Sequence, residues 1–329
     1  MIKGKTILIT GGTGSFGTTA TRYFLAQGAG EIRIFSRDED KQVRMRRDFD
    51  DARLRFHLGD VRDRASVNQA VDGAELVFHA AALKQIPICE THPDQAFLTN
   101  VIGSQNVIEA AIERRVASVV CLSTDKAVYP ISSLGLTKAL MDRLVRARAR
   151  QLEDGSTVLC CVRYGNVLYS RGSVVPLFVE QLLSGQQLTI TNPGMTRFLI
   201  LLEEAIALIE KALGHGRPGD IFILRSPAAT VADIAEAVND LFDGGGNSRV
   251  VGTRPGEKIH EVLATREELA TAEDFGRGYR LQGIPGSSEL VATDYTSENT
   301  ERLDVVRVKA LLQRVPEIRQ RLVPAFAEI

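Results

Sequence analysis

The sequence contains little cysteine, and its cysteines form no pattern typical of a metal site or a disulfide framework. They are Cys89, Cys121, Cys160 and Cys161, and no two of them stand in a C-x-x-C arrangement. Cys160 and Cys161 are adjacent in a probable strand, where they are poorly placed to bridge each other. We therefore expect reduced, mostly buried thiols and no metal site.

The sequence also lacks an excess of either charge and a long uninterrupted apolar run. Its 40 basic and 41 acidic residues give a net charge of −1, which leaves no global field to attract nucleic acid or an anionic membrane. Glu203 and Glu204 interrupt the most apolar segment, residues 198–213, and the N-terminus has no signal-like apolar stretch. The basic run at 143–150 alternates with apolar residues, as on a solvated helix face. We expect a cytoplasmic protein that binds neither nucleic acid nor membrane.

The first half of the chain alternates short apolar runs with amphipathic segments. The predicted strands, most of them rich in β-branched residues, are 6–10, 31–35, 54–58, 76–80, 118–122 and 158–163. The predicted helices are 15–28, 103–115, 133–145, 203–213 and 230–242. Strands and helices that alternate in this way predict an α/β fold with a doubly wound parallel sheet of Rossmann type.

The regular alternation of strands and helices fades after residue 165, which indicates a domain boundary near this position. We expect residues 1–165 to form an NADP-binding Rossmann domain, with a return segment near 196–225. Residues 166–195 and 226–329 are expected to form a smaller, mainly C-terminal substrate-binding domain and a C-terminal tail.

A glycine-rich turn follows the first predicted strand. Gly11, Gly14 and Gly17 have a G-x-x-G-x-x-G spacing and stand directly before a predicted helix. Glycine lets the backbone turn sharply and approach a pyrophosphate, whose charge is stabilised by the free N–H groups of the helix N-terminus. In this context the turn predicts a dinucleotide site.

The residues after the second predicted strand favour NADP. An acidic residue at this point would bind the ribose 2′-hydroxyl of NAD, whereas Ser36 and Arg37 offer a hydroxyl and a guanidinium to a 2′-phosphate. Asp38 comes one residue later and is an alternative partner for Arg37. Asp60, after the third strand, is placed either to meet the adenine amino group or to cap a helix.

Several motifs resemble those of the extended short-chain dehydrogenase/reductase family. The resemblance runs from about residue 3 to about residue 310, and "STDKA", "MTRF" and "RPGEK" are specific to UDP-N-acetylglucosamine 4,6-dehydratases. "PAAT" and "YTSENTERLDV" resemble the capsular, C5-inverting subgroup in particular. The motifs that carry the resemblance, besides the glycine-rich turn, are "HAAALKQIP" (79–87), "TNVIGSQNV" (99–107), "STDKA" (123–127), "RYGNV" (163–167), "SRGSVVPLF" (170–178), "MTRF" (195–198) and "RPGEK" (254–258).

The resemblance implies a lyase that oxidises C4 of the sugar, eliminates water across C5 and C6, and returns the hydride to C6. Elimination needs a base at C5 and an acid at the departing C6 hydroxyl. By resemblance Lys126 is the base and Asp125 the acid, and both follow a strand end, where ligands bind in such sheets. Thr124 would bind the 4-hydroxyl, and Lys138 would hold the nicotinamide ribose and favour loss of the O4 proton.

One position departs from the pattern of the wider family. Leu134, four residues before Lys138, stands where most extended short-chain dehydrogenases carry the tyrosine that takes the O4 proton. The capsular subgroup tends to have methionine there, so an apolar residue is compatible with turnover. The O4 base is left open between Lys138, a bound water and Tyr129, with Lys138 acting through water preferred.

The resemblance also implies the ligand contacts. UDP carries about two negative charges at neutral pH and needs positioned cations rather than a global field. The implied cofactor-binding residues are Gly11, Thr13, Gly14, Ser15, Phe16, Gly17, Ser36, Arg37, Asp60, Val61, Ala80, Ala81, Ala82, Lys138 and Tyr164. The implied substrate-binding residues are Lys84, Asn166, Ser173, Val174, Arg197, Arg254 and Glu257.

Three functions are compatible with this sequence. The leading one is an NADP-dependent UDP-N-acetylglucosamine 4,6-dehydratase, expected as a homo-oligomer. A nucleotide-sugar epimerase would share the cofactor and the oxidation step, but it needs no acid and base for loss of water, so Asp125 and Lys126 argue against it. A non-catalytic protein that binds NADP and a UDP-sugar is the third.

Overall fold

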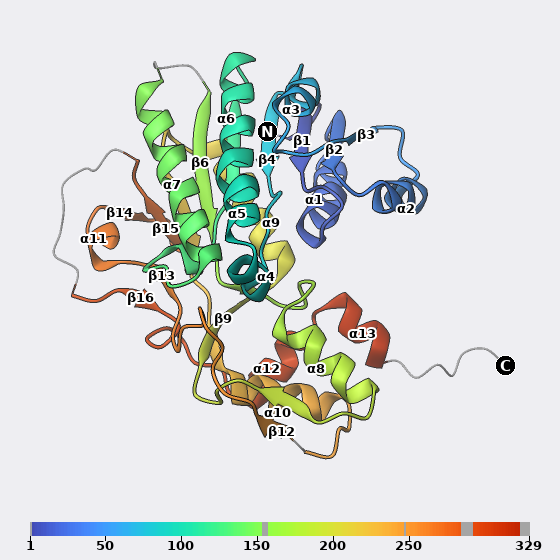
Figure 1. Ribbon diagram of the computed structural model, residues 1–329, viewed down its shortest axis with the longest axis vertical. Coiled ribbons are helices and arrows are strands. Elements are labelled where there is room, and N and C mark those ends of the chain that lie inside the picture. The colour runs from blue at the N-terminus through green and yellow to red at the C-terminus, as the bar shows by residue number, and fades with distance from the viewer. Residues whose placement is uncertain (1, 153–156, 247, 284–291, 323–329) are drawn as a thin grey trace.

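The computed structural model describes residues 2–152, 157–246, 248–283 and 292–322. Its centre is a nine-stranded sheet of order β14-β15-β10-β6-β5-β4-β1-β2-β3 (Figure 1). The strands from β3 to β10 pair in parallel, and β15 and β14 extend the sheet as an antiparallel edge. These strands are β1 (Thr6–Thr10), β2 (Glu31–Ser36), β3 (Leu54–Leu58), β4 (Leu76–His79), β5 (Ser118–Leu122), β6 (Val158–Arg163), β10 (Ile221–Leu224), β14 (Ala272–Asp274) and β15 (Gly278–Leu281).

All six strands predicted from the sequence are present, with β2 one residue longer and β4 one residue shorter than expected. The α/β Rossmann-type fold is therefore confirmed. The strand order changes direction between β1 and β4, which leaves a crevice at the carboxyl ends of these two strands. The glycine-rich turn follows β1 and lies at this switch point.

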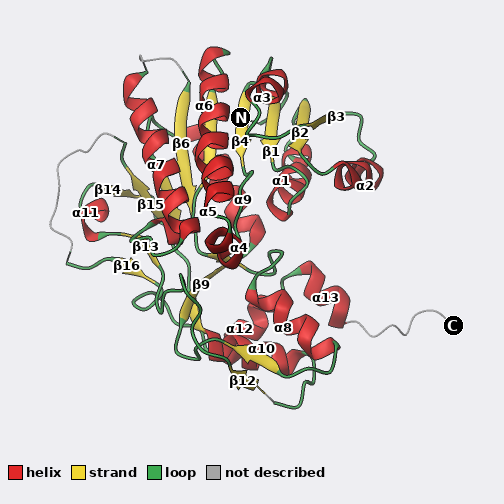
Figure 2. Ribbon diagram, viewed as in Figure 1, coloured by secondary structure: helices red, strands yellow, loops and turns green. Residues whose placement is uncertain are grey.

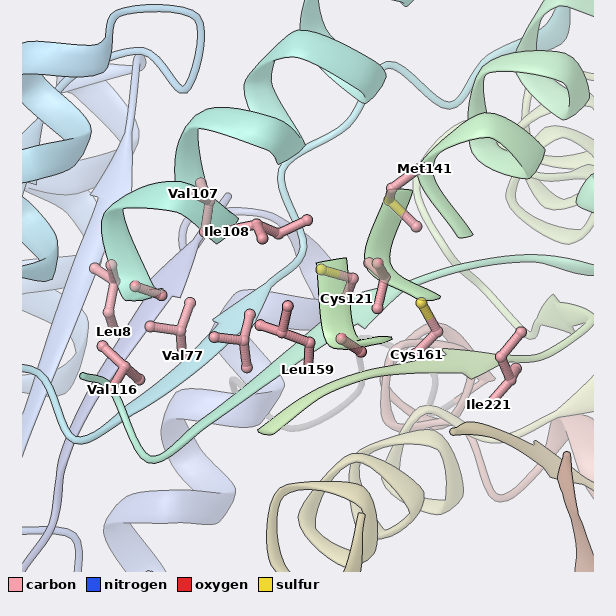
Figure 3. Packing of buried hydrophobic residues seen from close by; sticks show 14 of the residues in the cluster. Leu8, Val77, Val107, Ile108, Val116, Cys121, Met141, Leu159, Cys161 and Ile221 are labelled. Carbon is pink, nitrogen blue, oxygen red and sulfur yellow. The ribbon is translucent and has the colours of Figure 1, made fainter. Parts of the chain in front are cut away.

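Helices cover both faces of the sheet (Figure 2). On one face, Val107 and Ile108 of α6 and Met141 of α7 pack on strand residues such as Val77 and Leu159 (Figure 3). Each fully buried aliphatic side chain of this kind stabilises the fold by about 1.5–3 kcal/mol relative to an exposed one. This face carries α3 (Arg64–Val71), α6 (Gly103–Glu113) and α7 (Ser133–Gln151), and the other carries α1 (Ser15–Ala26), α2 (Glu39–Phe49) and α9 (Leu202–His215).

A second, smaller lobe has a hydrophobic core of its own, which includes Phe178, Ile234 and Val308. The sequence predicted α10 of this lobe, but not its other helices. The lobe contains α8 (Val174–Leu183), α10 (Val231–Leu241), α12 (Val305–Leu312), α13 (Pro316–Leu322), β8 (Leu188–Ile190) and β12 (Ser248–Val250). Residues 272–281, although expected in the substrate-binding domain, belong to the nine-stranded sheet as β14 and β15. Of the expected C-terminal tail, residues 323–329 lie outside the described ranges.

Short elements connect the lobe to the sheet. Two small sheets lie between the second lobe and the large sheet. One has three strands in the order β11-β9-β7, and the other is the pair β13-β16. These elements are β7 (Asn166–Val167), β9 (Thr196–Ile200), β11 (Ala228–Thr230), β13 (Val262–Ala264) and β16 (Tyr295–Thr296). The remaining helices are α4 (Ile86–Thr91), α5 (Pro93–Phe97), η1 (Leu98–Ile102), η2 (Asp125–Ala127) and α11 (Arg266–Leu269).

Most arginines of the basic run on α7 contact other residues of this chain. Arg148 forms an ion pair with Glu109 at 2.6 Å, and Arg146 donates to the carbonyl of Gln282.

Among the helices that the structure describes, none is long and apolar enough to cross a membrane.

Candidate active site

A cavity of about 1380 Å³ lies at the carboxyl edge of the sheet. We call it the central cavity. Its wall includes every residue predicted for the site except Gly17 and Asp125, and residues of the second lobe such as Leu177 and Val231 contribute to its far side. The ends of parallel strands beside a switch point are the usual place for a ligand in a sheet of this kind.

The glycine-rich turn has the geometry that a dinucleotide site needs. Gly11 has a φ of 67°, and a Cβ there would lie 2.9 Å from the backbone of Ala81. Gly14 precedes α1, whose first turn holds no acidic residue and no side-chain cap, so the helix N-terminus is open to an anion. Gly17 lies outside the cavity wall because it packs against the turn, where a Cβ would come 2.3 Å from the Gly12 carbonyl.

The residues after β2 present cations to the central cavity. Arg37 and Lys41 both line it, and the Arg37 guanidinium lies 3.5 Å from Asp60. Asp38 caps α2, because its carboxylate accepts from the Lys41 backbone N–H at 3.0 Å and pairs with the Lys41 ammonium. Ser36 is buried, and its hydroxyl accepts from Gln42 at 3.1 Å. The Asp38 carboxylate, the nearest one after β2, is thus already bonded to Lys41 of the same chain.

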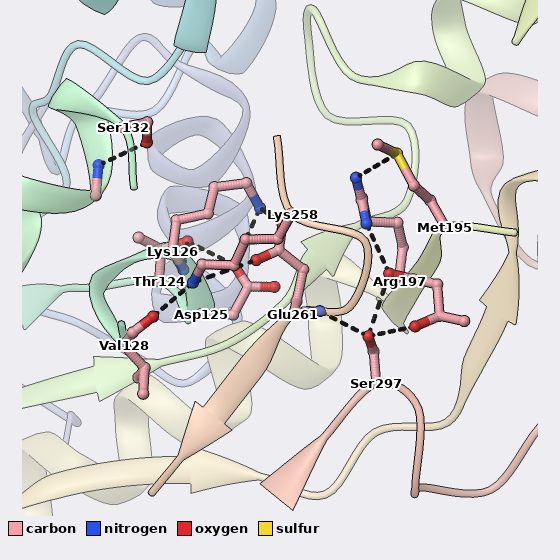
Figure 4. A network of polar contacts seen from close by, with 12 residues as sticks. Thr124, Asp125, Lys126, Val128, Ser132, Met195, Arg197, Lys258, Glu261 and Ser297 are labelled. Atoms are coloured by element: carbon pink, nitrogen blue, oxygen red, sulfur yellow. Dashed lines mark hydrogen bonds and ion pairs between the residues drawn. The ribbon is translucent and has the colours of Figure 1, made fainter. Parts of the chain in front are cut away.

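The Asp125–Lys126 pair lies in η2, directly after β5 (Figure 4). The Lys126 ammonium is 3.0 Å from Asp125 Oδ1 and 3.2 Å from Glu261 Oε1, so it lies between two carboxyl groups. Thr124 donates its hydroxyl to Asp125 Oδ1 at 2.9 Å. Thr124, Lys126 and Glu261 line the central cavity, whereas Asp125 is fully buried behind them.

Gly165 shapes the approach to Asp125. A Cβ at Gly165 would lie 2.3 Å from Phe198 Cβ, so no side chain fits there, and the same Cβ would lie 3.3 Å from Asp125 Oδ2. Gly165 also lines the central cavity. Gly165 therefore lies between the central cavity and the Asp125 carboxyl, which itself has no exposed surface, and a side chain at this position would contact that carboxyl.

The proton affinities in this cluster are set by burial and by opposing charges. Burial raises the pKa of Asp125, and the Glu261 charge adds to this effect against the opposing Lys126 charge. Burial acts to lower the pKa of Lys126, but the Asp125 and Glu261 carboxyl groups outweigh it, so that the pKa of Lys126 is raised. The shift at Asp125 has the direction that an acid needs, whereas the raised pKa of Lys126 is opposite to what a base needs and leaves Lys126 as an ammonium at rest.

The sequence prediction missed Glu261, although it lies only four residues after Glu257. Its backbone N–H donates to Ser297 Oγ at 2.8 Å, and the Ser297 N–H donates back to the Glu261 carbonyl. A parallel bridge between Thr196 and His260 brings this segment beside β9. Nothing in the local spacing signals this placement, because it depends on contacts with residues far away in the sequence.

Lys138 and Leu134 lie one turn apart on α7, and both line the central cavity. Lys138 is buried, and its ammonium donates to the Leu122 carbonyl at 2.8 Å. Burial lowers the pKa of Lys138. Leu134 packs with Cys89 and Ala96 in a small hydrophobic cluster. Neither Leu134 nor its immediate neighbours in this cluster can exchange a proton with a ligand at neutral pH.

The two tyrosines near the predicted site face different surroundings. Tyr129, with a φ of 44°, is half-exposed and is absent from the wall of the central cavity. Tyr164 is buried in that wall, with its ring 5.0 Å from the ring of Phe16. Burial, followed by the charge of Asp125, raises the pKa of Tyr164. The structure therefore gives no support to Tyr129 as the O4 base.

The far part of the central cavity carries the predicted substrate contacts. Arg197 is buried, and its guanidinium is oriented by bonds to the carbonyls of Thr196 at 2.8 Å and Ile259 at 3.2 Å. Asn166 Oδ1 and Ser173 Oγ are buried without a hydrogen-bond partner in the part of the chain that the structure describes. Both residues line the central cavity, so a polar ligand bound there would find two unpaired oxygen atoms.

Further cations lie along the same wall. Arg254 and Lys84 line the central cavity, as does Arg171, which the sequence prediction missed. Partial desolvation, followed by the Arg171 charge, lowers the pKa of Lys84. Glu257 Oε2 accepts from the Arg254 backbone N–H at 3.3 Å. The described residues contain no cluster of three or more His, Cys, Asp or Glu side chains that could hold a metal ion.

The doubly wound sheet, the glycine-rich turn and the cavity at the carboxyl edge, taken together with the similar proteins, identify an enzyme of the nucleotide-sugar dehydratase and epimerase type within the short-chain dehydrogenase/reductases. The chain belongs to the polysaccharide biosynthesis protein family, whose model matches residues 7–283, and the model of that family's C-terminal region matches residues 282–319. A curated relative, the UDP-glucose 4-epimerase of Rickettsia conorii, is 47% identical over 98% of this chain and 99% of its own.

Two solved structures of other proteins have the same fold. Pen from Bacillus thuringiensis superposes with a TM-score of 0.90 at 33% identity, covering 95% of this chain and 99% of that one. DesIV, a dTDP-glucose 4,6-dehydratase from Streptomyces venezuelae solved with NAD and TYD bound, has a TM-score of 0.71 at 24% identity over 77% of this chain and 86% of its own. The second likeness extends to the fold alone.

Proposed function

We propose that this protein is an NADP-dependent UDP-N-acetylglucosamine 4,6-dehydratase that inverts C5. The observation that carries the proposal is the buried cluster in which Lys126 contacts both Asp125 and Glu261 at the cavity wall. Loss of water from a sugar requires a proton donor at the leaving oxygen and a base at the neighbouring carbon. An epimerase that only oxidises and re-reduces C4 has no use for such a cluster.

The cofactor site is argued from the glycine-rich turn and the end of β2. The open N-terminus of α1 suits a diphosphate, and Arg37 and Lys41 suit a 2′-phosphate, while Asp38 is already engaged as a helix cap. A bound nicotinamide would supply the hydride acceptor for C4 and the hydride donor for C6. These contacts support NADP over NAD.

The cofactor preference can be tested at Arg37. Arg37→Asp should weaken NADP binding by about 10- to 100-fold, because a charge-assisted contact is replaced by repulsion, and should spare or improve NAD binding. Fluorescence titration of both cofactors measures the two dissociation constants. Arg47→Asp, an equally large charge change on an exposed side chain of α2, serves as the control. Equal weakening of NADP and NAD in Arg37→Asp would contradict the assignment.

The substrate would extend from η2 into the second lobe. Arg197 and Arg254 are the proposed partners of the diphosphate, with Lys84 close by and Glu257 on the ribose hydroxyls. Asn166 Oδ1 and Ser173 Oγ would gain from the ligand the hydrogen bonds that they lack. The resemblance of residues 227–230 and 295–305 to the capsular subgroup supports an inverting outcome at C5.

The residues of this chain would handle three protons. Lys138, through a water, would take the O4 proton during oxidation, and its lowered pKa favours that role. Lys126 would first pass the extra proton of its ammonium to solvent, and the neutral amine would then remove the C5 proton, which the new C4 ketone makes acidic. Asp125, which lies beside Gly165 of the cavity wall, would protonate the C6 hydroxyl as it leaves.

A nucleotide-sugar 4-epimerase is the second candidate, because the curated Rickettsia relatives bear that name at 46–48% identity. It would need the same cofactor and the same oxidation at C4. The buried Asp125–Lys126–Glu261 cluster would then have no proton to transfer to a leaving hydroxyl. A non-catalytic protein would bind both ligands and release no product.

The mass of the product separates these functions. Incubation with UDP-N-acetylglucosamine and no added oxidant should yield a product lighter by one water, which mass spectrometry detects directly. A product of unchanged mass but altered stereochemistry, seen by NMR, would assign the protein as an epimerase. An unchanged substrate with bound ligands would indicate the non-catalytic alternative.

A further inference from the structure

The cluster around Lys126 contains one more carboxyl group than the acid-base pair requires. Asp125 and Glu261 are both almost completely buried, and each contacts the single Lys126 ammonium. Two ionised carboxyl groups in the same buried space repel each other, and the one with fewer cations around it is the one whose charged form is disfavoured. One of the two carboxyl groups should therefore carry a proton at rest.

The surroundings decide which carboxyl keeps the charge. Glu261 faces the Lys126 ammonium and also Lys258, which lies 3.8 Å from its Oε2, and it is near the Arg197 guanidinium. Burial acts to raise the pKa of Glu261, but these three cations outweigh it and lower that pKa. Glu261 is thus the carboxyl that stays ionised.

Asp125 has fewer cations around it than Glu261 has. The cations that act on it are Lys126, which it shares with Glu261, and the more distant Lys258. Its other titratable neighbours are Glu261, a negative charge, and Tyr164, a neutral phenol. Asp125 Oδ2 and Glu261 Oε2 are both buried without a hydrogen-bond partner within the described ranges, but Glu261 Oε2 has the Lys258 ammonium 3.8 Å away. A proton at Asp125 Oδ2 removes the conflict between the two carboxyl groups.

We propose that Glu261 is a positioning residue that keeps Asp125 in its acid form, by serving as the counter-ion of Lys126. This inference rests on the proposed dehydration and assigns a role to a residue outside the Asp125–Lys126 pair. Without Glu261, Lys126 would pair with Asp125 alone and draw it into the carboxylate form. The acid needed at C6 would then be lost, although the base at C5 would remain.

The step that depends on Glu261 is departure of the C6 hydroxyl. The Asp125 O–H bond breaks as a new O–H bond forms on the C6 oxygen, and the C6–O bonding pair leaves with the water. The electron pair left at C5 by removal of its proton forms the C5–C6 double bond. Asp125 ends as a carboxylate, and over a full cycle its proton is replaced by the one released from the 4-hydroxyl.

A substrate whose leaving group needs no proton isolates this role. UDP-6-deoxy-6-fluoro-N-acetylglucosamine loses fluoride as an anion, so its elimination uses the C5 base but needs little help from an acid. In Glu261→Gln, elimination of water should fall by about 100-fold or more, and elimination of fluoride by less than about threefold. Asp125→Asn should show the same contrast. Lys126→Ala should lose both eliminations.

Matched variants complete the test. Glu267→Gln, the same change on an exposed side chain of α11, should leave both eliminations unchanged, and Glu261→Asp, which keeps the charge, should recover part of the loss. An equal fall of both eliminations in Glu261→Gln would overturn the proposal, because Glu261 would then serve the base or the fold. An unchanged rate of water loss would overturn it as well.

Infrared spectroscopy tests the proposal without turnover. The carbonyl stretch of a protonated carboxylic acid should be present in the wild-type protein at neutral pH and absent in Asp125→Asn and in Glu261→Gln. If that band persists in Glu261→Gln, Glu261 does not hold Asp125 in its acid form. If the wild-type protein eliminates neither water nor fluoride, the proposed dehydration fails, and the infrared band still decides the relation between Glu261 and Asp125.

Discussion

Replacing Lys126 by alanine should stop the reaction after oxidation of C4. Removal of the C5 proton needs a base at the cavity wall, and Lys126 is the proposed base in a cluster whose other members are carboxyl groups. Loss of general base catalysis should lower the rate of product formation by about 100- to 10,000-fold. Reduced nicotinamide should accumulate in a single turnover, visible by its absorbance, together with a 4-keto-hexose.

Lys126→Arg sharpens this test. Arginine keeps the positive charge between Asp125 and Glu261, but it stays protonated in proteins and cannot act as a base. Lys126→Arg should therefore be as inactive as Lys126→Ala, while Lys309→Ala, a surface change on α12, should have no effect. Recovery of activity in Lys126→Arg would mean that the charge alone matters and that Lys126 is not the base.

Removing the charge of Lys138 should nearly abolish turnover at the oxidation step. Lys138→Met keeps the length of the side chain in its buried position and removes the ammonium, so the expected loss of about 100- to 10,000-fold reports on proton transfer at O4 rather than on packing. Reduced nicotinamide should fail to accumulate in this variant, in contrast to Lys126→Ala. Circular dichroism and thermal unfolding check that the variant is folded.

Leu134 and Tyr129 provide the controls for Lys138. Leu134→Met should leave turnover largely intact, because both side chains are apolar and similar in volume. Tyr129→Phe should also be harmless, since Tyr129 is half-exposed and absent from the cavity wall. A loss in Tyr129→Phe as deep as that in Lys138→Met would mean that the phenol reaches O4 in the complex and that Lys138 is not the principal group.

Most of the Rossmann part of the fold was predictable from the sequence. The six predicted strands and helices such as α1 and α7 coincide with the structure within a few residues, except that α7 continues to Gln151. The glycine-rich turn was predictable as well. Short runs of apolar, β-branched residues, helical periodicity and glycine at a sharp turn all reflect preferences of residues that are near neighbours in the chain.

The parts that the sequence did not reveal depend on contacts between distant segments. The antiparallel edge strands β14 and β15 are short, and their place in the sheet becomes visible only when β10 is there to pair with them. Their few residues carry too little periodic pattern to separate a strand from a loop. The same holds for β7, β9 and β11, which connect the two lobes.

The candidate site also contains residues that the sequence revealed and Glu261, which only the tertiary structure revealed. Asp125 and Lys126 are adjacent in the sequence, and the resemblance of their motif was enough to propose them as an acid-base pair. Glu261 reaches Lys126 only because Thr196 pairs with His260 and Ser297 holds the Glu261 backbone. Burial and charge at Asp125 follow from that approach, since desolvation and Coulomb interactions are set by distance in space and not by separation along the chain. The local sequence thus determined which groups can exchange protons, and the tertiary structure decided which of them holds the proton at rest.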